Sequence, residues 1–337
     1  MEILPGLIDS AAILRTQGTT DAIHREFRAG RLVRIRRGFY VQTGDWLRAR
    51  PSERFAWSTA AVARSVKGAV LCGETAALAV GLPTLRTPPW VELATALPGR
   101  CGVRRSPLMV LGEEAAARQV REKRSYPLRY RLKPALETVV HGEFRCTSPV
   151  QTTLDLMVTG KLSEALVVAD GLARTLHREG RLAADANLLA VPEIADGISA
   201  HPHASARRRA EAVAALASPL AESVGESYSR AAFEFLGFEQ PVLQHVFHDQ
   251  EGFIGRADCW WPRQRVVGEF DGKAKYLDSA VRGAVSPEEA VYREKLREDR
   301  IRGLGLSFVR WGWADVESPD RLRRKLLTAG LRPRIRS

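Results

Sequence analysis

Two apolar runs, each ending in acidic side chains, lie within residues 256–276 and constrain the fold more than any other part of the chain. A turn signal, Trp-Pro-Arg-Gln, separates the two runs. Strand side chains alternate between faces, so polar groups two residues apart in the second run share a face, and a hairpin brings the acid of the first run alongside them. These groups are Asp258 from the first run and Glu269, Asp271 and Lys273 from the second.

Carboxylates and a lysine at one end of a small sheet can hold a divalent metal beside a phosphate. Glu269 lies in the apolar sequence Val-Val-Gly-Glu-Phe, and acids are rarely buried without a partner or a metal. The alternative is a solvated strand end, because Asp271-Gly272 is also a good turn signal. We therefore predict a carboxylate site, with Mg²⁺ or Mn²⁺ as its ion.

The flanking sequence predicts the order helix, three antiparallel strands, helix, strand. A helix over 222–236, ended by Gly237, carries Glu226 on its more polar side. Its predicted apolar stripe consists of Val224, Tyr228, Ala231, Ala232, Phe235 and Leu236. The remaining predicted elements are strands over 243–247, 253–259, 265–270 and 306–311 and a charged helix over 292–304.

This order and its motifs resemble the PD-(D/E)XK nuclease fold, and within it the very-short-patch-repair endonuclease and its relatives. The resemblance covers roughly residues 220–330. The matching pieces are Gly225-Glu226-Ser227, Arg256-Ala257-Asp258, Val267-Gly268-Glu269-Phe270-Asp271-Gly272, Arg297-Glu298-Asp299 and Val309-Arg310-Trp311.

The resemblance implies a metal-dependent endonuclease with Asp258 and Glu269 as the principal metal ligands. Glu226 would contact the metal or its bound water from the helix. The alternative for Glu226 is a surface ion pair with Arg230, four residues further along the same helix.

The remaining roles are also implied by the resemblance. Lys273, or Asp271 in its place, would orient the attacking water or polarise the scissile phosphate, and Arg297 and Arg310 would neutralise phosphate charge. Many relatives carry a histidine shortly after the Glu-x-Asp-Gly stretch, where this chain has Lys-Ala-Lys-Tyr at 273–276. The alternative is a degenerate fold that does not cleave.

The charge of the chain indicates a polyanionic partner. Its formal net charge is +12 and its isoelectric point is about 10.0. Residues 25–37 hold six arginines and one acid, and residues 321–337 hold seven basic residues and no acid. Such clustering favours nucleic-acid binding over the alternative of a merely arginine-rich composition.

The first arginine cluster lies in a predicted winged helix-turn-helix. Helices are expected over 7–14 and 22–29, the second with Ile23 and Phe27 on its core side and Gly30 at its C-cap. A hairpin over 32–35 and 38–41 follows. The string RAGRLVRIRRGFYV resembles the head of AbiEi-type antitoxins from type IV toxin–antitoxin systems, which implies a cognate toxin as a partner.

The predicted winged helix supplies candidate contacts to double-stranded DNA. The alternative is a winged helix used only for protein contacts. The candidates are Thr19, Thr20, His24, Arg25 and Arg28 on or near the recognition helix and Arg34, Arg36 and Arg37 on the wing.

The fold class expected for the chain is multidomain α/β (α+β). The predicted domains are a winged helix over 1–50, an AbiEi-like central α/β domain over 51–205 and a restriction-endonuclease-like domain over 206–337. In the central domain, Ser148 is expected to cap a helix that opens with Pro149. Four dispersed cysteines, no secretory signal and no long apolar run favour a reduced, cytoplasmic, non-membrane protein.

Two functional hypotheses follow. The first is a metal-dependent DNA endonuclease whose winged helix locates its substrate; an RNA-directed nuclease is a variant, because the phosphate chemistry is shared. The second is a non-catalytic transcriptional regulator or antitoxin-like protein. A winged helix often dimerises on a palindromic site, so either form is compatible with a homodimer.

Overall fold

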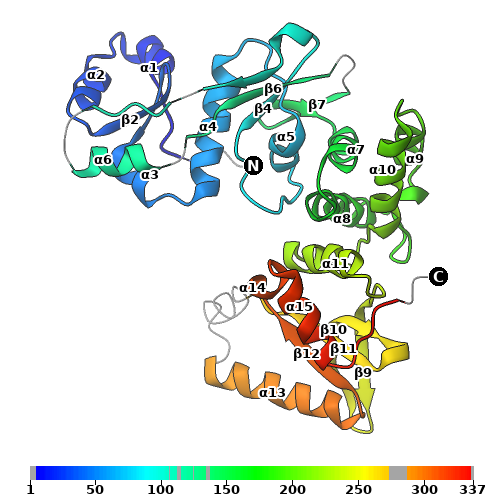
Figure 1. Cartoon of the computed structure of the whole chain (residues 1–337). Coiled ribbons are helices and arrows are strands. Elements are labelled where there is room, and N and C mark those ends of the chain that lie inside the picture. Colours follow the sequence, from blue (N-terminus) through cyan, green and yellow to red (C-terminus); the bar gives the residue numbers. More distant parts are fainter. Residues whose placement is uncertain are drawn as a thin grey trace. The chain divides into compact units, whose positions relative to one another are not determined.

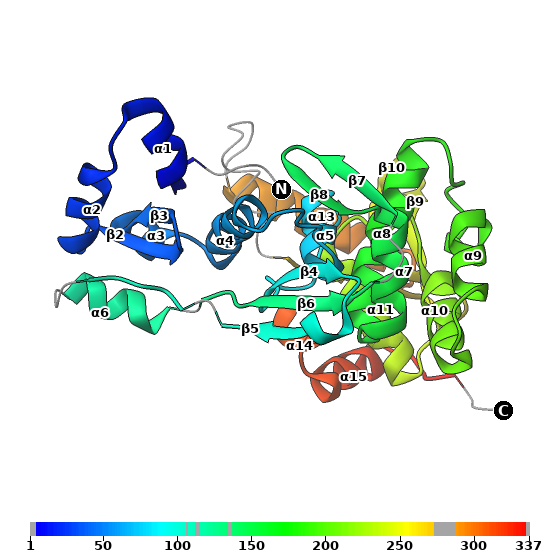
Figure 2. The same ribbon diagram turned by 90° about the horizontal axis from the view of Figure 1, so that it is seen from above.

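The computed structural model describes residues 5–105, 107–111, 115–123, 125–133, 137–272 and 287–334. Lys273 therefore lies outside the described residues. The chain divides into two compact units, Met1–Leu156 and Met157–Ser337, and each unit mixes helices with small sheets (Figures 1 and 2). The chain is thus a mixed α/β protein, and the three-domain division remains a prediction.

The first unit begins with two helices and a three-stranded sheet of order β1-β3-β2. Ile23 and Phe27 are buried and pack in one cluster with Leu32 and Tyr40, as the spacing predicted. The elements are β1 (Ile8–Asp9), α1 (Ser10–Gln17), α2 (Asp21–Arg28), β2 (Leu32–Arg36), β3 (Phe39–Gln42) and α3 (Thr43–Arg48).

Two predicted details of this region are wrong. The first helix does not begin at Leu7, because Ile8 pairs with Tyr40 in the sheet and Asp9 caps the helix by accepting the N–H groups of Ala11 and Ala12. Gly30 lies one position beyond the C-cap of α2, with φ of 73°.

The rest of the first unit forms a second sheet of order β4-β6-β5 and a hairpin of β7 and β8. Ser148 Oγ accepts a 3.2 Å hydrogen bond from Gln151 N at the start of α7, which confirms the predicted cap. The elements are α4 (Pro51–Ser65), α5 (Gly73–Ala79), β4 (Val91–Thr95), η1 (Pro98–Arg100), β5 (Gly102–Arg104), α6 (Ala115–Glu122), β6 (Leu128–Leu132), β7 (Thr138–His141), β8 (Phe144–Thr147) and α7 (Pro149–Thr159), which runs across the division between the units.

Helices open the second unit. A buried ion pair joins the first to the last of them: both Asp170 carboxylate oxygens lie 2.9 Å from Nη1 of Arg230. The elements are α8 (Leu162–Arg178), η2 (Leu188–Ala190), α9 (Pro192–Ser199), α10 (Ala204–Leu216) and α11 (Val224–Leu236).

A four-stranded sheet of order β12-β11-β10-β9 follows α11, in the predicted element order. Strands β9, β10 and β11 are antiparallel, whereas β12 runs parallel to β11 after the α13 crossover. The elements are β9 (Val242–Asp249), β10 (Gly252–Trp261), η3 (Pro262–Gln264), β11 (Val266–Phe270), α13 (Pro287–Gly303), β12 (Ser307–Trp311), α14 (Trp313–Val316) and α15 (Pro319–Thr328).

The two faces of this sheet carry separate apolar clusters, so the second unit has helices on both sides of its strands (Figure 1). Phe233 of α11 packs edge-on against Trp261 and Trp311 on one face. Ile301 of α13 packs with Phe308 on the other face. The sheet is therefore a buried layer between two sets of helices.

The predicted apolar stripe of α11 is wrong at one position. Phe235 is 73% exposed, whereas Phe233 is fully buried. Glu226 is only 2% exposed and does not lie on a solvated side. The sheet covers a different sector of the helix than the sequence spacing alone indicated.

Within the described ranges, none of the helices combines the length and apolar character needed to cross a membrane. The four cysteines, Cys72, Cys101, Cys146 and Cys259, carry free thiols.

Candidate functional site

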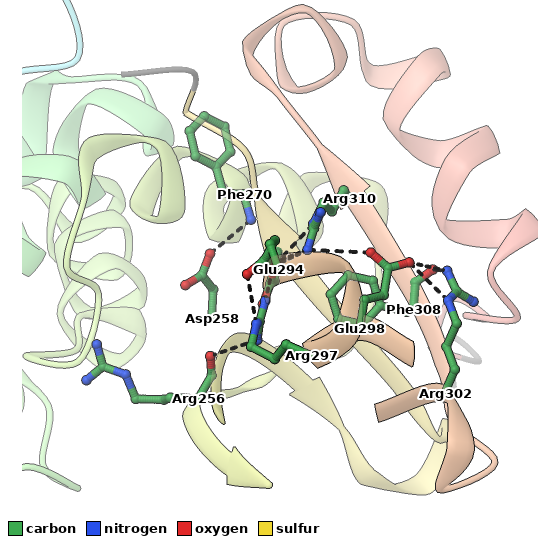
Figure 3. A network of polar contacts seen from close by, with 10 residues as sticks. Arg256, Asp258, Phe270, Glu294, Arg297, Glu298, Arg302, Phe308 and Arg310 are labelled. Atoms are coloured by element: carbon green, nitrogen blue, oxygen red, sulfur yellow. Dashed lines mark hydrogen bonds and ion pairs between the residues drawn. The ribbon is translucent and has the colours of Figure 1, made fainter. Parts of the chain in front are cut away.

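Asp258 and Glu269 are neighbours on adjacent antiparallel strands. The register pairs Cys259 of β10 with Gly268 of β11, and one further step places Asp258 opposite Glu269. Asp258 Oδ2 accepts a 3.0 Å hydrogen bond from the backbone N–H of Phe270 (Figure 3). The hairpin thus brings the two predicted acids together, as the alternation pattern required.

Two arginines from later elements bind Glu269. Arg297 of α13 donates to one carboxylate oxygen, and Arg310 of β12 donates to the other through Nε at 3.2 Å. Arg310 is also the register partner of Glu269 in the parallel β11–β12 pair. The Glu269 side chain is 13% exposed, so this carboxylate is largely desolvated and held by charge-assisted hydrogen bonds.

Glu294 of α13 completes a four-membered charge cluster. It accepts hydrogen bonds from Arg297 Nε at 3.0 Å and Nη2 at 2.6 Å, and it also pairs with Arg310 (Figure 3). Two carboxylates and two guanidiniums therefore balance formally. Glu298 extends the cluster, lying 3.5 Å from Arg310 and 2.8 Å from Arg302.

The pKa shifts in the cluster follow from burial and pairing. Burial raises the pKa of Glu269 above its ordinary value, and the charge and hydrogen bond of Arg297 only partly offset it. For Glu294 burial also acts to raise the pKa, but hydrogen bonds and charge from Arg297 and Arg310 outweigh it and lower the pKa. Burial acts to lower the Arg297 pKa, yet Glu294 and Glu269 raise it overall, so Arg297 stays cationic.

A glycine makes room for Arg297. A Cβ atom at Gly255 of β10 would lie 2.8 Å from Cδ of Arg297, closer than side chains normally approach. Arg297 Nη1 also donates to the Arg256 carbonyl at 3.3 Å. The bare backbone at Gly255 therefore lets the guanidinium reach across β10 to Glu269.

Glu226 is held at the start of α11 in a reciprocal cap. Ser223 Oγ accepts from Glu226 N at 3.2 Å and donates to Glu226 Oε1 at 2.7 Å, and Glu222 N donates to Oε2 at 2.9 Å. Gln244 Nε2 adds a 3.0 Å bond to Oε2. The ion pair of Glu226 with Arg230 is not the arrangement found, because Arg230 is paired with Asp170.

Gln244 makes its contact from an unusual backbone conformation. Its φ is 55°, a region that non-glycine residues seldom occupy. The residue lies inside β9, between the paired positions Leu243 and His245. The local distortion brings its amide to the buried Glu226 carboxylate.

Asp271 continues β11 beyond Glu269. Its N–H donates to the Trp311 carbonyl at 2.8 Å, and the residue is partly buried. Lys273, the predicted partner of this strand end, lies outside the described residues, and so does the stretch up to residue 286.

The donor chemistry at Asp258 and Glu269 suits Mg²⁺ or Mn²⁺, since Mg²⁺ is commonly held by one or two carboxylates together with waters and substrate phosphate. Across the ranges that the structure describes, however, no three His, Cys, Asp or Glu side chains come together as a metal-ligand set. Both Glu269 oxygens contact arginines. A metal ion could therefore bind Glu269 only by displacing Arg297 or Arg310 from a carboxylate oxygen.

In the first unit, the candidate DNA-contacting residues of α2 are solvent-accessible. His24, Arg25 and Arg28 are exposed, whereas Thr20 is half-buried. Thr20 occupies the N-cap position without a side-chain capping bond, and Thr19 Oγ1 accepts from Asp21 N at 3.2 Å.

The three arginines of the β2–β3 hairpin differ in their surroundings. Cζ of Arg34 lies 5.4 Å from the centroid of the Phe27 ring, and the Arg34 guanidinium contacts the sulfur of Met109. Arg36 is half-buried and donates to Ser65 Oγ, and burial lowers its pKa. Arg37 is exposed.

The sequence interpretation missed Glu294 and Gln244. Glu294 precedes Arg297 by three residues in a helix, a spacing that indicates an ion pair and could have revealed it. The Ser223-x-x-Glu226 spacing is a capping-box signal that could have revealed the buried position of Glu226. Nothing in the sequence marks Gln244.

Comparison with protein-family models, with curated proteins and with solved structures finds no match to this chain.

Proposed function

We propose that the chain is a DNA-binding protein whose second unit is a divalent-metal-dependent endonuclease domain. The observation that carries the proposal is the pairing of Asp258 with Glu269 across β10 and β11, with two arginines brought to the same place by α13 and β12. Acids for a metal and cations for a phosphate are the two requirements of phosphodiester hydrolysis.

Asp258 and Glu269 would hold Mg²⁺ or Mn²⁺, and the bound ion would supply charge stabilisation and a more acidic water. Asp271 follows on the same strand end. Glu226, fixed by Ser223 and Gln244, would contribute an oriented carboxylate from α11. Lys273 would serve as the proton-handling or phosphate-polarising group that the family resemblance implies.

Arg297 and Arg310 would exchange one anion for another. Both now neutralise Glu269, and both present guanidinium donors that suit phosphate oxygens equally well. A substrate phosphate bound beside Glu269 would accept the hydrogen bonds of both arginines, and the Glu269 carboxylate would lose its two cationic partners. Substrate binding would thereby prepare the acid for a metal, since an unpaired buried carboxylate is costly.

The first unit would supply DNA affinity. Its helix pair and β2–β3 hairpin agree with the winged-helix layout, and the exposed His24, Arg25, Arg28 and Arg37 offer polar and cationic contacts to phosphates. A cognate toxin and a homodimer are partners implied by the antitoxin resemblance and by winged-helix symmetry.

A second candidate function is non-catalytic DNA binding by a regulator. The capture of both Glu269 oxygens by arginines favours it, because a charge-balanced cluster needs no metal. In that case the sheet would be a scaffold, and its acids would serve to orient Arg297 and Arg310 toward DNA.

Cleavage of supercoiled and linear DNA with Mg²⁺ or Mn²⁺ separates the two functions. The full chain is compared with an Asp258→Ala/Glu269→Ala variant. A Glu211→Ala/Asp320→Ala variant is the control, because it removes two exposed acids of the same unit and so matches the change in charge.

The endonuclease proposal expects metal-dependent cutting that falls at least about 100-fold in the site variant and persists in the control. No cutting by the wild-type protein, with equal duplex binding by all three proteins, would overturn it in favour of the regulator.

A further inference from the structure

A basic cleft lies beside the charge cluster in the second unit. It has a volume of about 540 Å³ and lies between β12, α15 and the end of α13; Figure 1 shows α15 running next to β12. We call it the α15 cleft. Its charged lining residues are Arg302, Arg310, Arg321, Arg324, Lys325 and Asp315.

Among the described residues of this lining, the one acid is Asp315, and it is already neutralised. Asp315 Oδ2 lies 2.8 Å from Lys325 Nζ, and Oδ1 lies 3.2 Å from Arg321 Nε. Asp315 is also buried and accepts the Gly312 N–H at 3.0 Å, so it anchors the start of α14. The cleft consequently keeps an excess of positive charge.

Arg324 is the cation that best indicates an external ligand. It is exposed and lines the cleft, and in the part of the chain that the structure describes its guanidinium has no acidic partner. Ser307 and Thr328 lie in the same lining and add hydroxyl groups. Arginine with serine and threonine hydroxyls is the donor set that nucleic-acid phosphates receive.

Arg310 connects this cleft to the carboxylate site. It lines the cleft and also binds Glu269, while its backbone carbonyl accepts from Lys325 Nζ at 3.2 Å. A nucleic-acid backbone with one phosphate at Arg310 could therefore also contact the cations of α15.

We propose that the α15 cleft binds the phosphodiester backbone of the nucleic acid whose phosphate reaches Arg310. The inference rests on the proposed nucleic-acid function, but it does not require that the strand be cut. We commit to a nucleic-acid strand and not to free phosphate, because the cations of the lining come from three elements: Arg302 of α13, Arg310 of β12, and Arg321, Arg324 and Lys325 of α15.

Arg324→Ala and Arg323→Ala form the test pair. Both arginines are exposed on α15 and carry the same charge, but Arg323 does not line the cleft. Binding of the full chain to a fluorescent DNA duplex is measured over a range of salt concentrations, and the thermal midpoint of each variant is recorded as a check on folding.

Arg324→Ala is expected to weaken binding on the order of tenfold, as the loss of one charge-assisted hydrogen bond implies. It should also make the slope of log affinity against log salt shallower by about 1. Arg323→Ala should change both quantities much less, and both variants should melt like the wild-type protein.

Three other results have distinct meanings. Equal weakening by both variants would overturn the cleft while leaving DNA binding intact. If inorganic phosphate at low millimolar concentration protects the wild-type protein against thermal unfolding and Arg324→Ala abolishes that protection, while duplex binding stays unchanged, the site is one for small anions and the proposal fails. No duplex binding by the wild-type protein would instead overturn the proposed function itself.

Discussion

The carboxylate of Asp258 accepts a 3.0 Å hydrogen bond from the backbone N–H of Phe270, which follows Glu269 directly in the chain. Figure 3 shows this contact, by which Asp258 of β10 holds the backbone of β11 directly after Glu269. A side chain thus performs here what a ladder carbonyl performs elsewhere in the sheet. Asp258 therefore has a structural role, accepting the Phe270 N–H, that can be separated from its proposed role as a metal ligand.

Asp258→Asn and Asp258→Ala separate these duties. Asparagine keeps an oxygen that can accept the Phe270 N–H but loses the negative charge, whereas alanine loses both. We expect the alanine variant to be about 1–2 kcal/mol less stable than the asparagine variant in thermal unfolding, because a partly buried N–H loses its acceptor. Metal-dependent cleavage should be lost in both. Cleavage that survives in Asp258→Asn would show that the charge is dispensable.

Local patterns sufficed to predict the pairing of Asp258 with Glu269, because strand alternation and a turn between two apolar runs act over short distances. The partners of Glu269 could not be predicted in the same way. Arg297 and Arg310 reach it from 28 and 41 residues away, through a crossover that only the folded sheet defines. The resemblance implies that both arginines neutralise phosphate, whereas in the structure the anion that they bind is the Glu269 carboxylate.

The error on α11 has the same origin. Phe233 and Phe235 are equally apolar, and the periodicity of an isolated helix does not decide where its buried sector ends. Phe233 packs edge-on against the Trp261 and Trp311 rings, with ring centroids at 5.3 and 5.4 Å, and this tertiary contact determines which of the two phenylalanines is buried. Phe235 is left in solvent.

Gly255→Ala is predicted to disturb the charge cluster from outside it. The new Cβ would lie 2.8 Å from Arg297 Cδ, so the arginine must move away from Glu269 and Glu294. We expect a loss of about 1–3 kcal/mol, as for other overpacked sites. Thermal unfolding at low and high salt measures this loss of stability. The stability of the variant should depend less on salt than that of the wild-type protein, because the ion pairs of Arg297 are weakened.

The matched control for this substitution is Gly303→Ala, at the last residue of α13. A Cβ there meets no atom within 4 Å and the backbone is not left-handed. Replacement should be neutral or stabilising by about 0.4–1 kcal/mol. Equal destabilisation by both alanines would mean that steric contact with Arg297 is not the cause.

Arg37→Ala and Arg36→Ala are predicted to act differently on the first unit. Arg37 is exposed, so its loss should weaken duplex binding and make the salt slope shallower by about 1 without changing the melting temperature. Arg36 is half-buried against Ser65, so its loss should lower the melting temperature and change the slope less. Identical effects of the two variants on binding and on melting would contradict this assignment.

The pairing of Asp249 with Arg300 predicts a pH-dependent stability. The two side chains join the end of β9 to α13 through bonds of 2.6 and 2.8 Å, and the hydrogen bond from Arg300 lowers the pKa of Asp249 below its ordinary value of 3.8. A lowered pKa means that the pair stabilises the fold above about pH 3.8 and that this contribution is lost as the pH falls through the folded-state pKa. Asp249→Asn should therefore melt at a lower temperature than the wild-type protein at neutral pH, and this difference in melting temperature should disappear in acid.

Glu251→Gln is the control, because that side chain is 81% exposed and lies 3.7 Å from Arg300. Its melting temperature should follow the wild-type value at every pH. A gap between Asp249→Asn and wild type that persists unchanged below the folded-state pKa of Asp249 would assign the stabilisation to packing instead of charge.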